Sequence, residues 1–355
     1  MDMITILLLI AGLVLLTIGA DVLVKGASSL AGSLGISPLV IGLTVVAFGT
    51  SAPEMSVSVS SAFKGSAEIA VGNVVGSNIC NVLLILGLSA IAASLVVQKQ
   101  LVKFDIPIMI YASLIVLLMS IDGQISRIDG VLLFAGIVAY TVFLIREARR
   151  EGVAVVEGAD DIEPPQPLWK NAILIIVGLA MLVLGSQWLV DGAVAIAKYF
   201  GLSELVIGLT IVAVGTSLPE LATSVMASLK GERDIAVGNI LGSNIFNIGA
   251  VLGLSGMVAP QGLPVAHTSL LVDIPVMILV ALACLPVFLA NYTVTRLDGV
   301  AFLVCYVVYV VYVVLAAQQS ALLATMIPFL LVIVALCITW WMLEAVKYLR
   351  RQVSA

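Results

Sequence analysis

The chain has 355 residues, of which 62% are hydrophobic and only 10% are charged, and its formal net charge is −5. Soluble domains carry roughly 25% charged residues, so the composition excludes a soluble globular protein and indicates a polytopic membrane protein. The four cysteines lie in apolar runs, which excludes a disulfide framework and favours small buried side chains. The single histidine, His267, argues against a histidine-built transition-metal site.

Apolar stretches long enough to span a bilayer, about 20 residues each, follow one another in two groups of five. The first group covers roughly 4–24, 37–63, 69–95, 104–121 and 129–146. The second covers roughly 171–197, 203–229, 235–258, 272–290 and 297–317, and an eleventh stretch lies near 321–346. The first stretch lacks the basic region and cleavage site of a secretory signal, so we expect it to be retained. The predicted fold is an all-α polytopic membrane protein with a ten-helix core and an eleventh C-terminal transmembrane helix.

A polar segment rich in acids and prolines separates the two groups. This composition is typical of a short solvated linker. Its acidic cluster has ligands for weak calcium binding, but a solubilising loop is the favoured interpretation; the cluster is Glu157, Asp160, Asp161 and Glu163. The predicted units are a first five-helix repeat at 1–146, a cytoplasmic linker at 147–169, a second repeat at 170–317, and a helix and tail at 318–355.

The two groups are copies of each other. A shift of the numbering by 166 aligns them without gaps from Gly12 and Gly178 through Gly87 and Gly253. Because each copy has an odd number of helices, the second must enter the membrane from the opposite side. Inverted repeats of this kind are typical of secondary transporters, which bind substrate near the middle of the membrane.

Basic residues test the orientation, because loops on the cytoplasmic side carry an excess of lysine and arginine. With the N-terminus outside, only Lys64, Arg127 and Lys198 of the 16 basic residues fall on the outer side. We therefore predict a multi-pass protein of the cell membrane with its N-terminus outside and its C-terminus in the cytoplasm.

A glutamate follows a proline in the middle of each repeat, in the sequences GTSAPE and GTSLPE. Pro53 and Pro219 cannot donate a backbone hydrogen bond, and each ring clashes with the carbonyl four residues earlier. We therefore expect a broken helix that frees the carbonyls of Ala47, Thr50, Ala213 and Thr216. Such backbone is tolerated at membrane depth where it lines a cavity.

Glu54 and Glu220 are the centre of the predicted site. Counting outward from the short hairpin loop at ~1.5 Å per residue, Glu54 reaches the depth of Asn81, and Glu220 reaches that of Asn247. The remaining candidates are hydroxyls near the same depth: Thr50, Ser51, Ser77, Thr216, Ser217 and Ser243. All these ligands are oxygens, which favours hard cations such as calcium and sodium.

Electrostatics supports the same interpretation. An ionised glutamate at the bilayer centre costs about 3 kcal/mol or more, and neither hairpin core contains a lysine or arginine. The acids must be protonated or must hold a cation, and either state suits an ion carrier. A single glutamate could be a protonated residue that only packs between helices, but two glutamates at equivalent positions of the repeats argue against this interpretation.

At these residues the chain resembles the cation/calcium antiporter superfamily, specifically the prokaryotic sodium/calcium exchanger branch. The motifs are GLTVVAFGTSAPE with GNVVGSNICN, and GLTIVAVGTSLPE with GNILGSNIFN, which correspond to that family's two α-repeats. The resemblance covers residues 4–317. It implies that the second and third helices of each repeat line the ion sites.

The resemblance also implies ligand sets. Glu54 and Glu220 would share calcium with the carbonyls of Thr50 and Thr216. One sodium side would use Ala47, Thr50, Ser51, Glu54 and Ser77, and the other would use Ala213, Thr216, Ser217, Glu220 and Ser243. The chain departs from the family in two respects. Asn81 and Asn247 are both amides, where exchangers of this type often have one aspartate, and the eleventh helix is additional.

The expected function is a secondary active antiporter that exchanges sodium for calcium by alternating access, without a cofactor and without a nucleic-acid partner. The oligomeric state is left open. A proton-coupled calcium/cation exchanger is the nearest alternative, and a passive channel is another. A remote alternative is an intramembrane serine protease, because Gly253–Gly256 reads GLSG, but the only histidine, His267, lies in the loop before the ninth helix.

Overall fold

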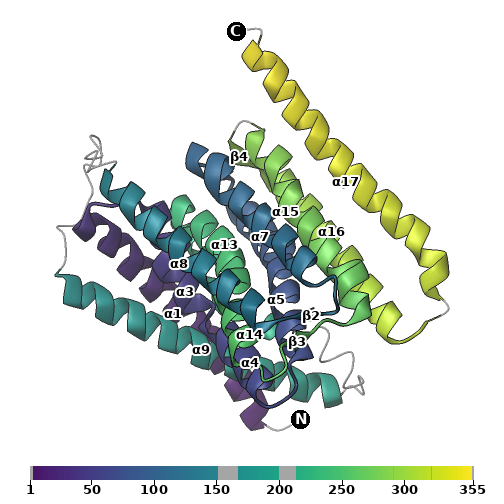
Figure 1. The fold of residues 1–355 in the computed structure, drawn as a ribbon. Coiled ribbons are helices and arrows are strands. Elements are labelled where there is room, and N and C mark those ends of the chain that lie inside the picture. Colours follow the sequence, from purple (N-terminus) through teal and green to yellow (C-terminus); the bar gives the residue numbers. More distant parts are fainter. Residues whose placement is uncertain (1–2, 151–166, 200–212, 291, 321, 354–355) are drawn as a thin grey trace.

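The computed structural model describes residues 3–150, 167–199, 213–290, 292–320 and 322–353 (Figure 1). The predicted acidic cluster of the linker lies outside these residues. Within them, nine helices are long and apolar enough to cross a membrane, and the bent pair Pro38–Thr50 and Ala52–Phe63 brings the number to ten. The predicted span 203–229 is described only in its second part. The chain is thus an almost entirely helical polytopic membrane protein, as the composition predicts.

The first repeat consists of helices, single π-helical turns (η) and two short strands. In chain order its elements are α1 (Met3–Leu34), α2 (Pro38–Ile41), η1 (Gly42–Val46), α3 (Ala47–Thr50), α4 (Ala52–Phe63), α5 (Glu68–Cys80), η2 (Asn81–Leu86), α6 (Gly87–Ala92), β1 (Leu95–Val96), η3 (Leu101–Asp105), α7 (Ile106–Met119), β2 (Gln124–Ile125) and α8 (Arg127–Arg150).

The second repeat has the same order of elements where it is described. They are α9 (Leu168–Tyr199), α11 (Ala213–Gly215), α12 (Leu218–Leu229), α13 (Arg233–Phe246), η5 (Asn247–Leu252), α14 (Gly253–Val258), β3 (Leu263–Pro264), η6 (Ser269–Asp273), α15 (Ile274–Leu289), β4 (Thr293–Val294) and α16 (Arg296–Ala317). The additional helix is α17 (Leu322–Val353).

The first helices of the two repeats, α1 and α9, pack on each other through glycines. A Cβ atom at Gly12 would lie 2.8 Å from the carbonyl oxygen of Gly185, and one at Gly19 would lie 3.0 Å from that of Gly178. Larger residues would force the two backbones apart, as at other small-residue interfaces between membrane helices. Because rising numbers on α1 meet falling numbers on α9, the two helices are antiparallel, as inverted repeats require.

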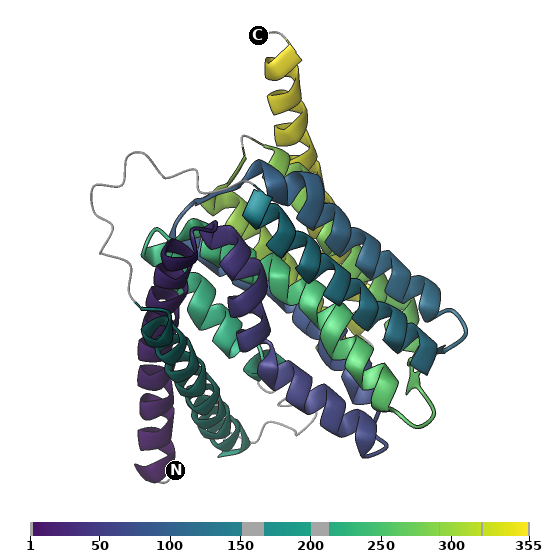
Figure 2. The same ribbon diagram turned by 60° about the vertical axis from the view of Figure 1, so that its left-hand side comes forward.

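The hairpins that follow form the centre of the molecule. The span that contains α5 is 78% buried and the span that contains α13 is 94% buried, whereas α1 and α9 are each 28% buried. Figure 2 shows the α1–α9 pair beside this central bundle. Polar side chains on α5 and α13 are therefore shielded from lipid, which is where a membrane protein can keep them.

Two small antiparallel sheets join the repeats to each other. Strand β1 pairs with β4, and β2 pairs with β3. Each sheet therefore contains one strand from each repeat, and the two sheets are counterparts under the repeat symmetry. They fix the relative position of the two halves outside the helical core.

Helix α17 packs against α15 and α16 at one edge of the bundle, and its C-terminal end extends beyond the other helices (Figures 1 and 2). It lies apart from the α1–α9 pair and from the central hairpins. The eleventh helix predicted from the sequence is thus peripheral to the ten-helix core.

Candidate cation-binding site

The helix is broken at the first GTSAPE motif, as the proline predicts. Helix α3 ends at Thr50 and α4 begins at Ala52, with a bend of 46° between the two segments. In the second repeat, α11 ends at Gly215 and α12 begins at Leu218. In both α4 and α12 the proline stands in the first turn, where its missing N–H costs no hydrogen bond.

Of the carbonyls that we expected to be free, that of Ala47 is bonded. The Ala47 carbonyl oxygen accepts the Ser51 N–H at 3.1 Å and the Thr50 hydroxyl at 3.4 Å. The Gly215 carbonyl oxygen, which the Pro219 ring displaces from helical bonding, accepts the hydroxyl of Ser186 on α9 at 2.6 Å. The expectation that Ala47 exposes a free carbonyl is therefore wrong, because the last turn of α3 bonds it from within.

The two glutamates are fully buried and are bonded across the repeat interface. Ser51 Oγ donates to Glu220 Oε1 at 3.0 Å, and Ser217 Oγ donates to Glu54 Oε1 at 3.0 Å. Each serine thus belongs to one repeat and each accepting glutamate to the other. Ser217 Oγ also lies 3.4 Å from Ser77 Oγ. The reciprocal bonds bring both motifs to one place at the centre of the molecule.

Several buried oxygens at this place have no hydrogen-bond partner. They share one chemical property, that each can accept a bond from a donor or ligate a cation; they are Glu54 Oε2, Glu220 Oε2, Asn81 Oδ1, Asn247 Oδ1 and Ser243 Oγ. A buried acceptor left without a partner costs about 1–3 kcal/mol. No lysine or arginine is buried among the described residues, so no side chain compensates the two carboxylates.

Most of the predicted residues are buried. The residues that the structure buries are Ala47, Thr50, Ser51, Glu54, Ser77, Asn81, Ser217, Glu220, Ser243 and Asn247. Thr216 is half-buried, and its hydroxyl lies 3.5 Å from Asn73 Oδ1. Ala213 begins α11, and its side chain lies outside the described part of the structure.

The predicted pairing of Glu54 with Asn81 is not observed among the described hydrogen bonds. Asn81 Nδ2 instead donates to Asn244 Oδ1 at 3.0 Å, and Asn247 Nδ2 donates to Asn78 Oδ1 at 3.1 Å. Equal depth in the two arms of a hairpin does not fix which way each side chain turns. The asparagines bond across the repeat interface and leave their own oxygens unpartnered.

Two asparagines that we did not single out from the sequence support the broken helices. Asn239 Nδ2 donates to the Glu220 carbonyl at 3.4 Å and to Ser224 Oγ at 2.9 Å, and its Oδ1 accepts the Thr50 hydroxyl at 3.1 Å. Asn73 makes the equivalent bonds, to the Glu54 carbonyl at 3.3 Å and to Ser58 Oγ at 2.9 Å. Their repetition at a spacing of 166 was the signal that could have identified them.

The donor set suits a hard cation. It consists of two carboxylates, amide oxygens and hydroxyls, which are ligands that calcium and sodium take in proteins. Within the described residues no group of three or more histidine, cysteine, aspartate or glutamate side chains is present, so a cation here would be held largely by neutral oxygens around Glu54 and Glu220. This arrangement can bind, compensate and release a hard cation.

A protease site is not assembled. Ser255 is fully buried in α14, whereas His267 is exposed in the segment that follows β3. A nucleophilic serine needs a base within hydrogen-bond reach, and His267 is not placed to provide it.

Comparisons with known proteins identify the family. The family model described as sodium/calcium exchanger protein matches residues 4–146 and 170–315. The chain is 46% identical over 254 residues to the putative antiporter CaxA of Alkalimonas amylolytica, covering 71% of this chain and 80% of the relative. It is 34% identical over 339 residues to the sodium/calcium exchanger MaX1 of Methanosarcina acetivorans, covering 85% and 96%.

Solved structures give the same result. The sodium-calcium exchanger NCX_Mj, soaked with zero Na+ and Ca2+, superposes with a TM-score of 0.76 at 32% identity, covering 88% of this chain and 100% of that chain. The two proteins therefore share one fold over the 88% of this chain that the match covers. The chain belongs to the sodium/calcium exchanger family, and it is a multi-pass cation/calcium antiporter and not an enzyme.

Proposed function

We propose that the protein exchanges sodium for calcium across the cell membrane, and that Glu54 and Glu220 carry the ions by alternating access. The observation that carries this proposal is the pair of buried carboxylates, each with one oxygen bonded by a serine of the other repeat and one oxygen unpartnered. A cation between the repeats would satisfy both free oxygens at once. The solved neighbour is named as a sodium-calcium exchanger, which supports the same ion pair.

The two ion fluxes would be coupled because the buried carboxylates need a cation to compensate their charge. Two ionised glutamates in a site without a basic residue are costly to bury, so the site is stable when it holds positive charge. One calcium or a set of sodium ions would supply that charge, and the two ions would compete for the same oxygens. The carrier would then change sides when loaded, which is the requirement for exchange without leak.

The ligands in this proposal are the residues predicted from the sequence other than Ala47, whose carbonyl already accepts the Ser51 N–H, with Asn73 and Asn239 as supporting residues. We take residues 1–146 and 170–317 as the two moving halves and place the N-terminus outside. The short linker at 147–169 would then be cytoplasmic. The side facing the cytoplasm would be the one with Lys25 and Lys230, which form ion pairs with Asp21.

The test is calcium uptake into proteoliposomes loaded with sodium, potassium or acid. The proposal predicts that internal sodium drives uptake at constant pH and that internal potassium does not. Uptake that follows an imposed pH gradient and ignores internal sodium would contradict it and would favour the proton-coupled exchanger. Paired buried acids suit protons as well as cations, so this measurement decides the coupling ion.

A further inference from the structure

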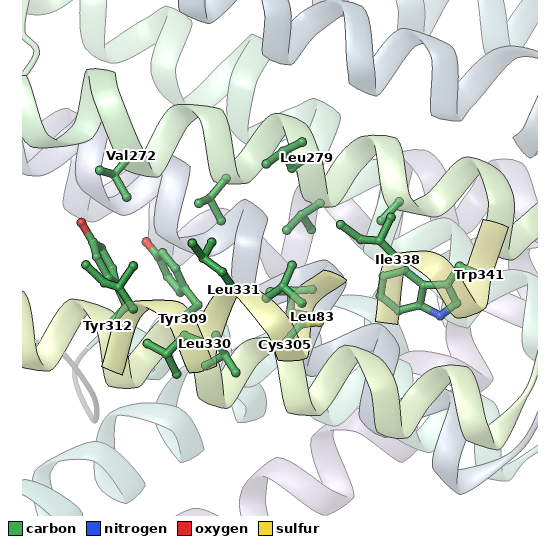
Figure 3. Close-up of a pocket in the computed structure, with 16 residues that line it drawn as sticks. Leu83, Val272, Leu279, Cys305, Tyr309, Tyr312, Leu330, Leu331, Ile338 and Trp341 are labelled. Atoms are coloured by element: carbon green, nitrogen blue, oxygen red, sulfur yellow. The ribbon is translucent and has the colours of Figure 1, made fainter. Parts of the chain in front are cut away.

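An apolar groove lies between α17 and the core, and neither Glu54 nor Glu220 lines it. Its volume is about 370 Å³. Its walls come from α15, α16 and α17, with Leu83 of η2 on the core side. Figure 3 shows Val272 and Tyr312 at one end of the groove and Ile338 and Trp341 at the other. Between Ile327 and Trp341, both of which line it, α17 rises about 21 Å at ~1.5 Å per residue.

Water is a poor occupant for this groove. Apolar cavities stay dry because water needs two to four polar partners, and the lining consists of aliphatic and aromatic side chains with Tyr309, Tyr312 and Trp341 as its polar members apart from one thiol. The Tyr309 hydroxyl already donates to Asp273 Oδ1 at 3.1 Å. All three wall helices are long and apolar enough to cross the membrane, so the apolar molecule that surrounds the groove is lipid. The rise of about 21 Å along α17 between Ile327 and Trp341 matches the length of one extended acyl chain.

Trp341 gives the groove a polar end. The residue is only 3% exposed, yet its indole N–H has no hydrogen-bond partner among the described residues. Its ring packs on Phe302 with the centroids 4.7 Å apart. A buried donor without an acceptor costs about 1–3 kcal/mol, so an acceptor at this end would be bound favourably. Tryptophan takes this interfacial role in membrane proteins.

Positive charge lies just beyond this end. Arg296 begins α16 about 9 Å along the axis from Phe302, and Lys347 lies about 9 Å along α17 from Trp341, at ~1.5 Å per residue. The rings of Tyr292, directly before β4, and Tyr348, near the end of α17, lie 6.1 Å apart and hold these two segments together. Arg296 is exposed and forms no ion pair in the described chain.

The acidic groups at this end do not cancel the charge. In the sequence, segments 292–298 and 344–351 together carry four basic residues and two acidic ones. Lys347 pairs with one of these acids, Glu344, at 2.7 Å. Asp298 is occupied by the cap of α16, where it accepts bonds from the N–H and the hydroxyl of Thr295. Clusters of basic residues beside a transmembrane helix attract anionic lipid headgroups.

From these contacts we infer that the groove binds one anionic glycerophospholipid. One acyl chain fills the space between α15, α16 and α17, an ester or phosphate oxygen accepts the Trp341 N–H, and the headgroup lies near Arg296 and Lys347. The lipid thereby joins the eleventh helix to the core and contacts Leu83, two positions beyond Asn81 in the chain. The inference is independent of which ion the carrier transports.

Native mass spectrometry of the full chain, titrated with phosphatidylglycerol or phosphatidylcholine, tests the inference. We expect one phosphatidylglycerol to be retained roughly 5- to 30-fold more tightly than phosphatidylcholine, since each basic residue favours an anionic headgroup. Trp341→Phe keeps the ring and removes the donor, and should weaken binding of both lipids roughly 3- to 10-fold. Arg296→Gln with Lys347→Gln should reduce the preference and keep the weaker binding.

Ala283→Phe fills the groove, whose wall includes Ala283, and should abolish retention of both lipids. Ala135→Phe is the matched control, because Ala135 is exposed on α8 away from the groove. If Ala283→Phe does not fold, Ala283→Leu makes the same test with a smaller side chain. Equal retention of the two lipids by the native chain, unchanged binding in Trp341→Phe, or equal retention by the Ala283 and Ala135 variants would overturn the inference.

Discussion

Ser51 of the first repeat donates its hydroxyl hydrogen to Glu220 of the second, with Oγ 3.0 Å from Oε1. The converse bond, from Ser217 to Glu54, has the same length. The symmetry ends there, because Ser217 also approaches Ser77 at 3.4 Å, whereas Ser243, the counterpart of Ser77, has no partner. The two halves of the site are therefore alike in composition and different in bonding.

This asymmetry predicts unequal effects for the two serines. Ser217→Ala removes two contacts and Ser51→Ala removes one, so the calcium concentration for half-maximal uptake should rise about 10-fold for Ser217→Ala and about 3-fold for Ser51→Ala. Uptake into sodium-loaded proteoliposomes measures both. Ser89→Ala is the control, since Ser89 is also fully buried but makes no hydrogen bond among the described residues. Equal effects at Ser51 and Ser217 would contradict the assignment.

The supporting asparagines should matter more for stability than for ion affinity. Asn239 is fully buried and makes three hydrogen bonds around the second broken helix, so Asn239→Ala should lower the free energy of unfolding by about 1–3 kcal/mol. Asn73 is only half-buried, and Asn73→Ala should cost less. Thermal unfolding in detergent measures the order, and a larger loss at Asn73 would refute it.

The amide at Asn247 predicts a gain of pH sensitivity on substitution. Asn247→Asp adds a third buried carboxylate to the core that contains Glu54 and Glu220 and removes the donor that bonds Asn78. A carboxylate binds a cation only when it is deprotonated, so the uptake rate of the variant relative to the native chain should rise with pH. Rates measured from acid to alkaline pH test this, with Asn78→Asp in the same network as a comparison. A ratio that stays constant would show that position 247 does not face the ion.

An ion pair holds α1 against the turn between α12 and α13. Lys230 pairs with Asp21 of α1, and Ser28 of α1 donates to Glu232 at 2.8 Å. Lys64 is the repeat equivalent of Lys230, so the symmetry places it opposite α9. On α9, Asp191 occupies the position equivalent to Lys25. Lys64 and Asp191 are both exposed, and neither forms an ion pair in the described structure. Under alternating access, the Lys230 pair should open when a Lys64–Asp191 pair closes.

Spin labels at Gly32 and Leu229 measure this opening, because Gly32 has open space around it and Leu229 is exposed. Lys230→Gln should populate a longer distance, and Lys64→Gln should depopulate it, each by about 2- to 5-fold, as expected for a partly exposed pair. Lys25→Gln is the control, since the ion pair of Lys25 among the described residues is with Asp21 of the same helix. A distance distribution that Lys230→Gln leaves unchanged would show that the Lys230–Asp21 ion pair does not control this opening.

The sequence predicted the large features because each has a strong local signal. Hydropathy indicates the spans, the 166-residue repeat with an odd number of helices indicates inversion, and Pro53 predicts the break that the structure places after Thr50. The antiparallel α1–α9 pair confirms the inversion. These features follow from the bilayer and the backbone, which leave few alternatives.

Side-chain partners were harder to predict. Asn81 was expected to meet Glu54 and instead bonds Asn244, because depth along a helix does not determine the direction of a side chain. The π-helical turn η2 begins at Asn81 and rotates the side chains that follow relative to an α-helix. The sequence contains no pattern that predicts this turn. Such turns often occur at functional sites, and their bonding depends on contacts that the sequence does not show.

The central claim is that Glu54 and Glu220 hold the transported cation between them. Calcium binding to the purified chain, measured by isothermal titration calorimetry with Glu54→Gln, Glu220→Gln and Asp105→Asn, tests it most directly. Asp105 is the matched control, because it is also fully buried but bonds Tyr140 at 2.8 Å and belongs to neither motif. The account predicts that each glutamine variant loses at least about 100-fold in affinity, roughly 3 kcal/mol, while Asp105→Asn stays within about 3-fold. Unchanged calcium affinity in both glutamine variants, or an equal loss in Asp105→Asn, would contradict it.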